Sequence, residues 1–563
     1  MKRFTSFATA IVFSISTPAF AQQQAAEDAA RTKTVVEQAM QTYRQGLSEI
    51  KESALARATQ PGGSSGALRE LRLEEAVTIA LEKNLDIQVA RLEPQSVDFQ
   101  IAGFRNQYQP VLASTVGQRD LFQLPTRTIN GGTRVNQATT TYNASMTQEV
   151  PVFGGSYSLA WTNQRVASSD ALATRNPLYT TGLVASYAQP ILRGFKTDNL
   201  RQQLAISVIN REVSEESARA TVAQTLANVR NAYWDLVFSQ SAVEVARRAT
   251  ELADKLVEDN QARVEVGTLA PLDIVQAQAE AATRRQNLAA AEATAQTAEL
   301  ALKRYIVNGT DDPMWRQTII PVDLPSIEPP PTDVEGAVRR ALAERTDIMN
   351  ARKGLDTSDI NIKYFKDQSM PALDLTASYG AQGLGGPELI RAGSGIDSQT
   401  TGQIIPGNYS QALSLLTNRD YPNWNFAVTM SYPLFGSQAT AQHARARLQR
   451  NQSMTRIRAL EVQVAAEVTN AALTVQSNLK RVEAATAARE LAQKRLEAEQ
   501  SKFDVGMTTN FFVVQAQRDL RDAANTELRA LADYRKSLVN FERAQQAPAG
   551  GGGGGNFAAT PQQ

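Results

Sequence analysis

Two stretches of forty residues decide the fold, because they are copies of each other. Residues 73–112 read LEEAVTIALEKNLDIQVARLEPQSVDFQIAGFRNQYQPVL, and residues 334–373 read VEGAVRRALAERTDIMNARKGLDTSDINIKYFKDQSMPAL. Fifteen of the forty positions are identical without a gap. In both stretches Ala-x-x-x-Ala-Leu has helical spacing and a Pro stands near the end. Each stretch therefore predicts a short amphipathic helix and then a second helix that ends before the Pro.

A second pair of matching motifs lies further along the chain. Val266-Gly267 and the Val-Gln-Ala-Gln at 275–278 match Val505-Gly506 and the Val-Gln-Ala-Gln at 514–517. The chain is therefore a tandem duplication, and we assign the first repeat to residues 67–325 and the second to residues 326–546.

Each repeat contains a long run without Gly or Pro. These runs, 195–266 and 437–505, are rich in Ala, Glu, Gln, Arg and Leu, which favour helices. About 70 residues at about 1.5 Å each give roughly 105 Å of helix. A shorter helix should follow each run, at 271–305 and 510–545. Each repeat thus predicts a helical hairpin that turns at Gly267 or Gly506, where Gly can end a helix with positive φ.

Between the helices, apolar and polar residues alternate with the period of a β-strand. Residues 373–379 and 426–432 show this pattern clearly. A soluble β-sandwich alternates in the same way, but long polar, Gly-rich connections at 120–139 and 380–423 suit the outer loops of a membrane barrel. The pattern predicts six strands, at 111–119, 140–150, 156–164, 181–189, 372–379 and 425–432.

The composition excludes several classes of function. The 563 residues include 58 Lys and Arg against 57 Asp and Glu, one His and no Cys. The balanced charge disfavours a nucleic-acid binder. Without Cys, and with His443 as the one imidazole, thiol catalysis, disulfides and multi-histidine metal sites are excluded. We therefore expect no catalytic residue, no metal site and no cofactor.

The ends of the chain carry separate signals. Residues 1–21 combine two basic residues, an apolar stretch and Ala-Phe-Ala, which predicts a cleaved signal peptide. Residues 22–66 predict a polar helix with a linker, and the Gly-rich residues 547–563 predict a disordered tail. With no apolar helical segment of about 20 residues, a membrane part would have to be a closed β-barrel. Four or six strands cannot close one alone, so several copies would have to share it.

Taken together, the duplicated Glu-x-Ala-Val-x-x-Ala-Leu opening, the paired Val-Gly tips and the strand-to-helix junctions resemble TolC-type outer membrane factors over residues 71–546. The junctions are Gln-Pro-Ile-Leu-Arg-Gly at 189–194, with Pro190 and Gly194, and Tyr-Pro-Leu-Phe-Gly at 432–436, with Pro433 and Gly436. The resemblance implies a mainly α-helical protein with a transmembrane β part. Three chains, each giving four strands, would form a twelve-stranded β-barrel that a long periplasmic α-helical barrel continues.

One segment departs from the family's pattern. The first repeat has an additional junction-like stretch, Pro-Val-Phe-Gly-Gly at 151–155. This stretch could be a periplasmic turn between two added strands, which would give six strands per chain and eighteen per trimer. Alternatively, the added pair of strands folds outside the barrel.

The resemblance also implies a gate and docking tips at the periplasmic end. Family members place a carboxylate six residues after each tip Gly, together with an aromatic residue and an Arg. Here Asp273 holds the first carboxylate position, Phe512 stands at the second, Phe503 is the aromatic residue and Thr508 replaces the Arg. We therefore expect a constriction formed by Asp273, Phe503 and Phe512, although Asp273 could instead simply cap its helix. The tips that would contact an adaptor are Val266, Gly267, Thr268, Leu269, Val505, Gly506, Met507 and Thr508.

The functional expectation is a passive export channel of the outer membrane that extends into the periplasm. Its partners would be a periplasmic adaptor and an inner-membrane transporter of the RND, ABC or MFS type, and efflux of small molecules is favoured over protein secretion. The alternative from another class is a periplasmic coiled-coil scaffold without a barrel.

Overall fold

The computed structural model describes residues 68–124, 134–170, 173–266, 271–323, 333–392 and 399–548. The predicted signal peptide, the N-terminal polar helix with its linker and the Gly-rich stretch of the tail lie outside these ranges. The chain divides into two units. The described part of the small unit is residues 68–69 and 308–318, and all other described residues belong to the large unit.

The first repeat contains two long helices and four long strands, together with shorter elements. Its elements are β1 (Leu68–Leu71), α2 (Leu73–Lys83), α3 (Leu85–Asn106), β2 (Val111–Gln123), β3 (Val135–Glu149), β4 (Ser156–Ser168), β5 (Leu178–Pro190), α4 (Asn199–Glu265), α5 (Pro271–Ile306), α6 (Pro313–Arg316) and β6 (Thr318–Pro321).

The second repeat follows the same order with fewer long strands. Its elements are α7 (Val334–Glu344), α8 (Thr346–Gln368), β7 (Ala372–Gly385), β8 (Glu388–Ala392), β9 (Gln399–Ile405), α9 (Tyr409–Asn418), β10 (Pro422–Ser431), α10 (Gln438–Asp504) and α11 (Asn510–Gln546).

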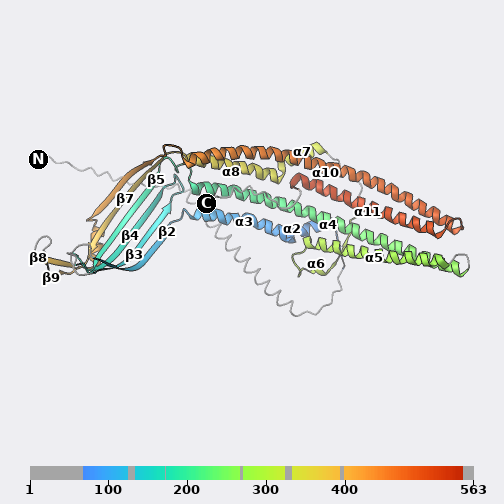
Figure 1. Cartoon of the computed structure of the whole chain (residues 1–563), viewed down its shortest axis with the longest axis horizontal. Coiled ribbons are helices and arrows are strands. Elements are labelled where there is room, and N and C mark those ends of the chain that lie inside the picture. The colour runs from blue at the N-terminus through green and yellow to red at the C-terminus, as the bar shows by residue number, and fades with distance from the viewer. Residues whose placement is uncertain are drawn as a thin grey trace. The chain divides into compact units, whose positions relative to one another are not determined.

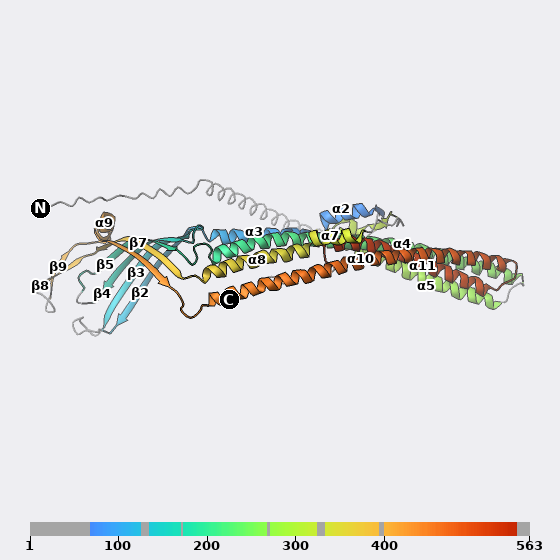
Figure 2. The ribbon, with the colours of Figure 1, turned by 90° about the horizontal axis from the view of Figure 1, so that it is seen from above.

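The predicted long helices are confirmed. Both α4 and α10 have 67 residues, so each is about 100 Å long. Asp198 caps α4 by accepting a hydrogen bond from the backbone N–H of Arg201, and Ser437 caps α10 by accepting one from Thr440. These bonds satisfy donors that the first helical turn leaves unpaired. In the large unit, the sheet lies at one end and the α4–α5 and α10–α11 hairpins reach the other end (Figures 1 and 2).

The two repeats share tertiary contacts as well as sequence. Arg211 on α4 bonds to Asp98 on α3 at 2.6 Å, and Arg450 on α10 bonds to Asp359 on α8 at 2.5 Å. Asp359 lies 261 residues after Asp98, the same separation as between residues 73 and 334 of the two copies. Arg450 lies 239 residues after Arg211, the same separation as between Val266 and Val505. Such half-exposed pairs contribute about 0–1 kcal/mol each, but they fix which helices are neighbours.

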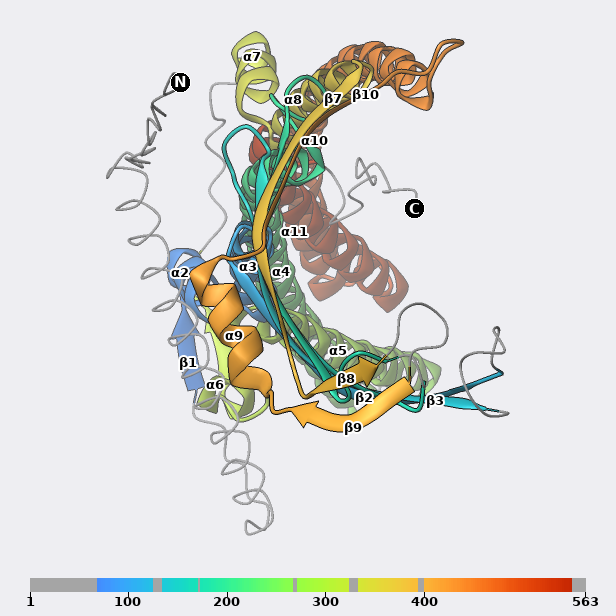
Figure 3. The same ribbon diagram turned by 90° about the vertical axis from the view of Figure 1, so that its left-hand side faces the viewer.

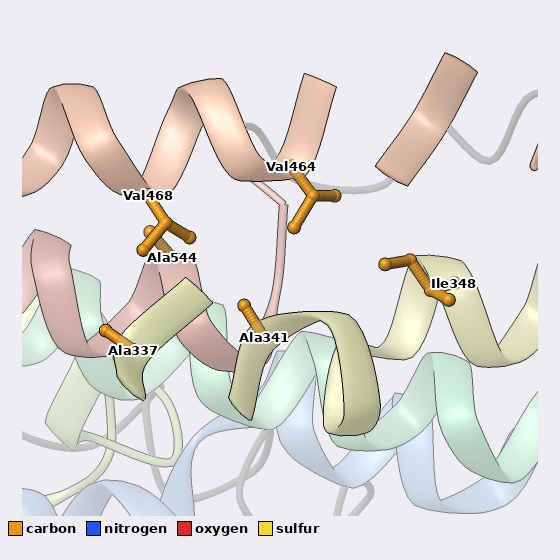
Figure 4. Close-up of a cluster of buried hydrophobic side chains, with 6 residues drawn as sticks. All are labelled: Ala337, Ala341, Ile348, Val464, Val468 and Ala544. Atoms are coloured by element: carbon orange, nitrogen blue, oxygen red, sulfur yellow. The ribbon is translucent and has the colours of Figure 1, made fainter. Parts of the chain in front are cut away.

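The short helices at the start of each repeat are anchored by small apolar side chains. In the second repeat, Ala337, Ala341 and Ile348 are fully buried against Val464 and Val468 of α10 (Figure 4). The equivalent residues of the first repeat, which are Ala76, Ala80 and Ile87, are also fully buried. The Ala-x-x-x-Ala-Leu spacing that both repeats share therefore places the buried alanines on the face of each short helix that packs against its neighbours.

The bend between the first two helices of each repeat is held by a buried polar side chain. In the first repeat, the side chain of Asn84 donates a hydrogen bond to the Tyr305 carbonyl at 2.9 Å. In the second repeat, Arg345, which is 1% exposed, donates to the Ala544 carbonyl at 3.0 Å and to Glu467 at 2.6 Å. The same contact therefore recurs with a different donor.

All six predicted strands are present, and they form one antiparallel sheet in the order β10-β7-β5-β4-β3-β2. The sheet of one chain therefore contains six strands, two more than the resemblance implies. The stretch at 151–155 is the turn between β3 and β4, and the Val150 backbone N–H bonds across it to the Gly155 carbonyl at 2.7 Å. Both added strands are paired on each side within the sheet.

The sheet has one apolar and one polar face, as the alternation predicts. Neighbouring rungs of the ladder point to opposite faces. An apolar rung consists of Leu112, Met146, Leu159, Ala185, Tyr379 and Trp424. The next rung on the other face contains Thr147, Ser158, Ser186, Ser378 and Asn425.

The described residues of the segment 380–423 include regular elements that the sequence analysis did not predict. The segment contains the end of β7, the β8–β9 hairpin and α9. Helix α9 packs on the apolar face, on the outer side of the curve that the sheet makes (Figure 3). Gly383 makes this contact possible, since a Cβ there would lie 1.8 Å from the Ala412 carbonyl oxygen. Tyr409 of α9 donates a hydrogen bond to Asn163 on the same face at 2.6 Å. Sequence periodicity alone did not reveal this helix because it has only ten residues.

Candidate functional site

The tip of the second hairpin is a tight, exposed turn. Gly506 has φ of +75°, its N–H bonds to the Phe503 carbonyl at 3.0 Å, and the Met507 N–H bonds to the Lys502 carbonyl at 2.8 Å. A left-handed Gly of this kind satisfies the last carbonyls of a helix. The flanking Val505 and Met507 are 70% and 79% exposed, so apolar side chains stand at the end of the hairpin.

The tip of the first hairpin is described up to Val266, which is exposed and follows the end of α4. The predicted tip residues Gly267, Thr268 and Leu269 lie outside the described residues. The next helix, α5, begins at Pro271.

The structure separates the predicted gate residues by exposure. Phe503 is buried between α10 and α11 with Val513 and Ala516. By contrast, Phe512 is 49% exposed and Asp273 is half-buried in the first turn of α5. In the described chain, Phe503 therefore supports the hairpin from inside, whereas Phe512 and Asp273 are accessible.

Two further contacts surround the gate positions. The Arg263 guanidinium of α4 lies 4.5 Å from the ring centre of Phe503, and it also bonds to Asp504 at 3.2 Å. Thr508, which replaces the Arg of the family, donates a hydrogen bond to Glu499 at 3.3 Å. The contact of Arg263 joins the tip of one hairpin to the other.

A charged cluster that the sequence analysis missed also joins the two hairpins. Glu280 and Arg284 of α5 are 7% and 4% exposed and form an ion pair one helical turn apart. Glu280 also binds Arg518 of α11, whose side chain is 48% exposed. We call Glu280, Arg284 and Arg518 the interhairpin cluster. The four-residue spacing of Glu280 and Arg284 was visible in the sequence, but the same spacing is common on solvated helix faces.

The protonation of the interhairpin cluster follows from its surroundings. Burial opposes ionisation of Glu280, but the hydrogen bond from Arg518 and the charge of Arg284 outweigh it, so the pKa of Glu280 is lowered. Burial and the nearby charge of Arg521 lower the pKa of Arg284. The hydrogen bond to Glu280 raises the pKa of Arg518. At neutral pH the cluster is therefore a charged link between the hairpins.

The first strand-to-helix junction is densely bonded. After Pro190, the Ile191 N–H continues the ladder to the Leu373 carbonyl at 2.8 Å. Gly194 has φ of +87°, and its N–H bonds to Asp367 of α8 at 2.7 Å. Arg201 bonds to the Gly194 carbonyl at 2.5 Å and to Asp198 at 2.8 Å.

The second junction is more open. After Pro433, Gly436 has φ of +102°, and a Cβ built on it would meet no atom within 4 Å. The chain then enters α10 through the cap at Ser437. Both predicted junction glycines therefore adopt the left-handed backbone, but only the first is enclosed by side chains.

Two general features complete the description. Within the described ranges, no group of three or more His, Asp or Glu side chains could hold a metal ion. No helix of the described chain is both long enough and apolar enough to cross a membrane.

Comparison with known proteins assigns the family. The Outer membrane efflux protein family matches residues 132–307 and 337–545, so the chain belongs to this family. No curated protein sequence matches the chain.

Several solved structures share the fold. The outer membrane channel CmeC of Campylobacter jejuni has a TM-score of 0.58 at 16% identity, with 84% of this chain and 85% of CmeC covered. The outer membrane protein VceC of Vibrio cholerae has a TM-score of 0.58 at 15% identity, with 84% of this chain and 96% of VceC covered. The open state of the outer membrane channel MtrE of Neisseria gonorrhoeae has a TM-score of 0.55 at 18% identity, with 84% of this chain and 89% of MtrE covered.

The protein is thus an outer membrane channel of the TolC type. Its fold is the duplicated helix-strand-helix unit of this family, in which long helices continue from a β-sheet and reach into the periplasm. This family consists of channels and not of enzymes.

We predict that replacing Arg518 by Ala weakens the connection between the hairpins. The substitution removes a charged hydrogen bond to a buried carboxylate, but half of the Arg518 side chain is exposed, so solvent screening keeps the expected loss at about 1 kcal/mol. The thermal unfolding midpoint, followed by the circular dichroism of the helices at pH 7, should fall. Arg529→Ala, an exposed position on the same helix, is the control and should leave the midpoint unchanged.

The effect should depend on pH with a definite sign. Because the pKa of Glu280 is lowered in the folded protein, its ionic contribution is complete above the unfolded pKa of about 4.3 and is lost as the pH falls through the folded pKa. The difference between wild type and Arg518→Ala should therefore shrink below about pH 4. A constant difference down to pH 3 would contradict this origin.

Proposed function

We propose that this protein is the outer membrane duct of a tripartite efflux system, which passively exports small molecules such as drugs or metabolites. The observation that carries the proposal is the combination of a two-faced sheet with long hairpins in one duplicated chain. The apolar rung would face lipid, and the polar rung would line a water-filled passage. Because no catalytic machinery is expected, energy would come from the inner-membrane transporter.

The partners follow from the ends of the hairpins. Exposed apolar residues at Val266, Val505 and Met507 offer a surface to a periplasmic adaptor, which would connect the duct to a transporter of the RND, ABC or MFS type. The alternative, a periplasmic scaffold, explains the sheet less well, because a soluble protein would expose the apolar face of the sheet to water. Efflux remains favoured over protein secretion.

Fractionation tests the proposed channel directly. The full-length protein should be recovered from detergent-extracted outer membranes as a trimer that dissociates on heating, because its apolar face needs lipid or detergent. Recovery as a soluble periplasmic protein would support the scaffold and reject the channel.

The tip proposal is tested at Gly506. Because its φ is +75° and no atom would meet a Cβ there, a substitution acts through the backbone and not through a clash. Gly506→Leu should leave the trimer assembled but abolish chemical crosslinking to the adaptor. Gly506→Asn is the matched control, since Asn tolerates the left-handed region, and it should keep most of the crosslinking. Undiminished crosslinking with Leu would refute the role of the tip.

The gate proposal is tested at Asp273. We propose that three copies of Asp273 and of the apolar Phe512 narrow the periplasmic end and favour cations weakly. Asp273→Asn should reduce the cation preference measured from single-channel reversal potentials, because it removes three charges from the constriction. The control Glu292→Gln, at an exposed position further along α5, should leave the cation preference unchanged. If Asp273→Asn leaves the reversal potential unchanged, the carboxylate merely caps its helix.

A further inference from the structure

The unpaired edges of the sheet point to its neighbours in the assembled channel. Strand β2 lies at one edge and β10 at the other, and the sheet pairs neither strand on its outer side. Strand β2 starts at the end of α3, next to the helices, whereas β10 ends there, just before α10. The two edges therefore run in opposite directions, as an antiparallel pair requires.

The side chains of the two edges also match. The even-numbered residues Leu112 and Val116 of β2 share the apolar face with Phe426 and Val428 of β10, and all four are more than half exposed. Any register that pairs even-numbered residues of both strands continues the apolar face without interruption. In lipid such edges must be paired, because no water satisfies their N–H and C=O groups.

The added hairpin β3–β4 is fixed in the wall. The ring of Phe153 in its turn stacks on Phe195 in the junction that precedes α4, with 4.7 Å between the ring centres. The neighbouring Gly154 lies so close to the junction that a Cβ would be 2.6 Å from the Gly194 carbonyl oxygen. Together with the ladders on both sides, these contacts hold the hairpin in the sheet between β2 and β5.

The helical layer that follows the sheet is also continuous across the chain. Four helices lie in the order α3, α4, α8 and α10, and an ion pair links each neighbouring pair. Arg211 and Asp98 link α4 to α3, Lys353 and Glu212 link α8 to α4, and the Arg450 pair links α10 to α8.

We propose that three chains close an eighteen-stranded barrel by pairing β2 of each chain with β10 of the next. The inference rests on the proposed trimeric channel and defines its bore. Since barrel diameter grows roughly in proportion to strand number, the lumen is about 1.5 times as wide as that of a twelve-stranded barrel. The outer membrane part therefore accepts bulkier cargo than a twelve-stranded wall would pass.

Disulfide crosslinking tests the proposal, because the natural chain has no Cys. Ser114→Cys is combined in turn with Cys at Phe426, Val428 or Met430, to cover three possible registers. After oxidation, the assembled trimer is isolated from outer membranes. Its disulfide crosslinks are then read on non-reducing gels. At least one combination should join most chains into covalent dimers and trimers, and each single variant should give none.

Two combinations within one chain locate the added hairpin. Ser114→Cys with Ala144→Cys should form a disulfide, since these residues are partners in the β2–β3 ladder. Ser114→Cys with Ala185→Cys should not, since β3 and β4 lie between β2 and β5. In a twelve-stranded wall that excludes β3 and β4, β2 would lie beside β5. The Ser114–Ala185 disulfide should then form, and the Ser114–Ala144 disulfide should not.

The outcomes are distinguishable from a failure of the proposed function. A protein that forms no outer membrane trimer rejects the channel itself. An intact trimer overturns the eighteen-stranded barrel if Ser114 crosslinks to Ala185, or if no combination of β2 with β10 links the chains.

Discussion

A β-sheet surrounded by lipid must pair every edge strand, and this constraint determines the rest of the structure. One chain supplies six strands and leaves β2 and β10 unpaired, so it cannot form a closed wall alone. The exposed apolar rung that includes Leu112 and Trp424 needs lipid on one side, and the polar rung needs water on the other. In the proposed channel, contact with lipid, association with further chains and a water-filled interior therefore follow from one requirement.

The helices form a layer that positions the strands of the sheet. The pairs Arg211–Asp98 and Arg450–Asp359 place equivalent helices side by side in both repeats, so the duplication builds a layer of even width. At the first junction, Gly194 and Asp367 connect the layer to the sheet. Farther down, the interhairpin cluster joins the hairpins of the two repeats. The large unit thus places the sheet at one end and the tips of both hairpins at the other.

The sequence predicted much of this fold, because duplication and periodicity report directly on regular packing. The long helices and the six strands were predictable, whereas the sequence left open whether the two strands beside 151–155 join the sheet. Helix α9 was not predictable, because it has only ten residues, and its position depends on Gly383 approaching the backbone of Ala412, which no local pattern records. The interhairpin cluster was missed for a similar reason, since Arg518 lies 238 residues from Glu280. Phe503 was expected at the gate, but its packing against Val513 became visible only in the hairpin.

The central claim is that three copies of this chain form one channel wall with six strands each. Electron cryomicroscopy of the detergent-extracted trimer measures this most directly, in a cross-section through the sheet region. The account predicts threefold symmetry and eighteen strands in a closed ring, with β2 beside β10 of the next chain. A ring of twelve strands, or a chain that remains single with both edges of its sheet free, would contradict it.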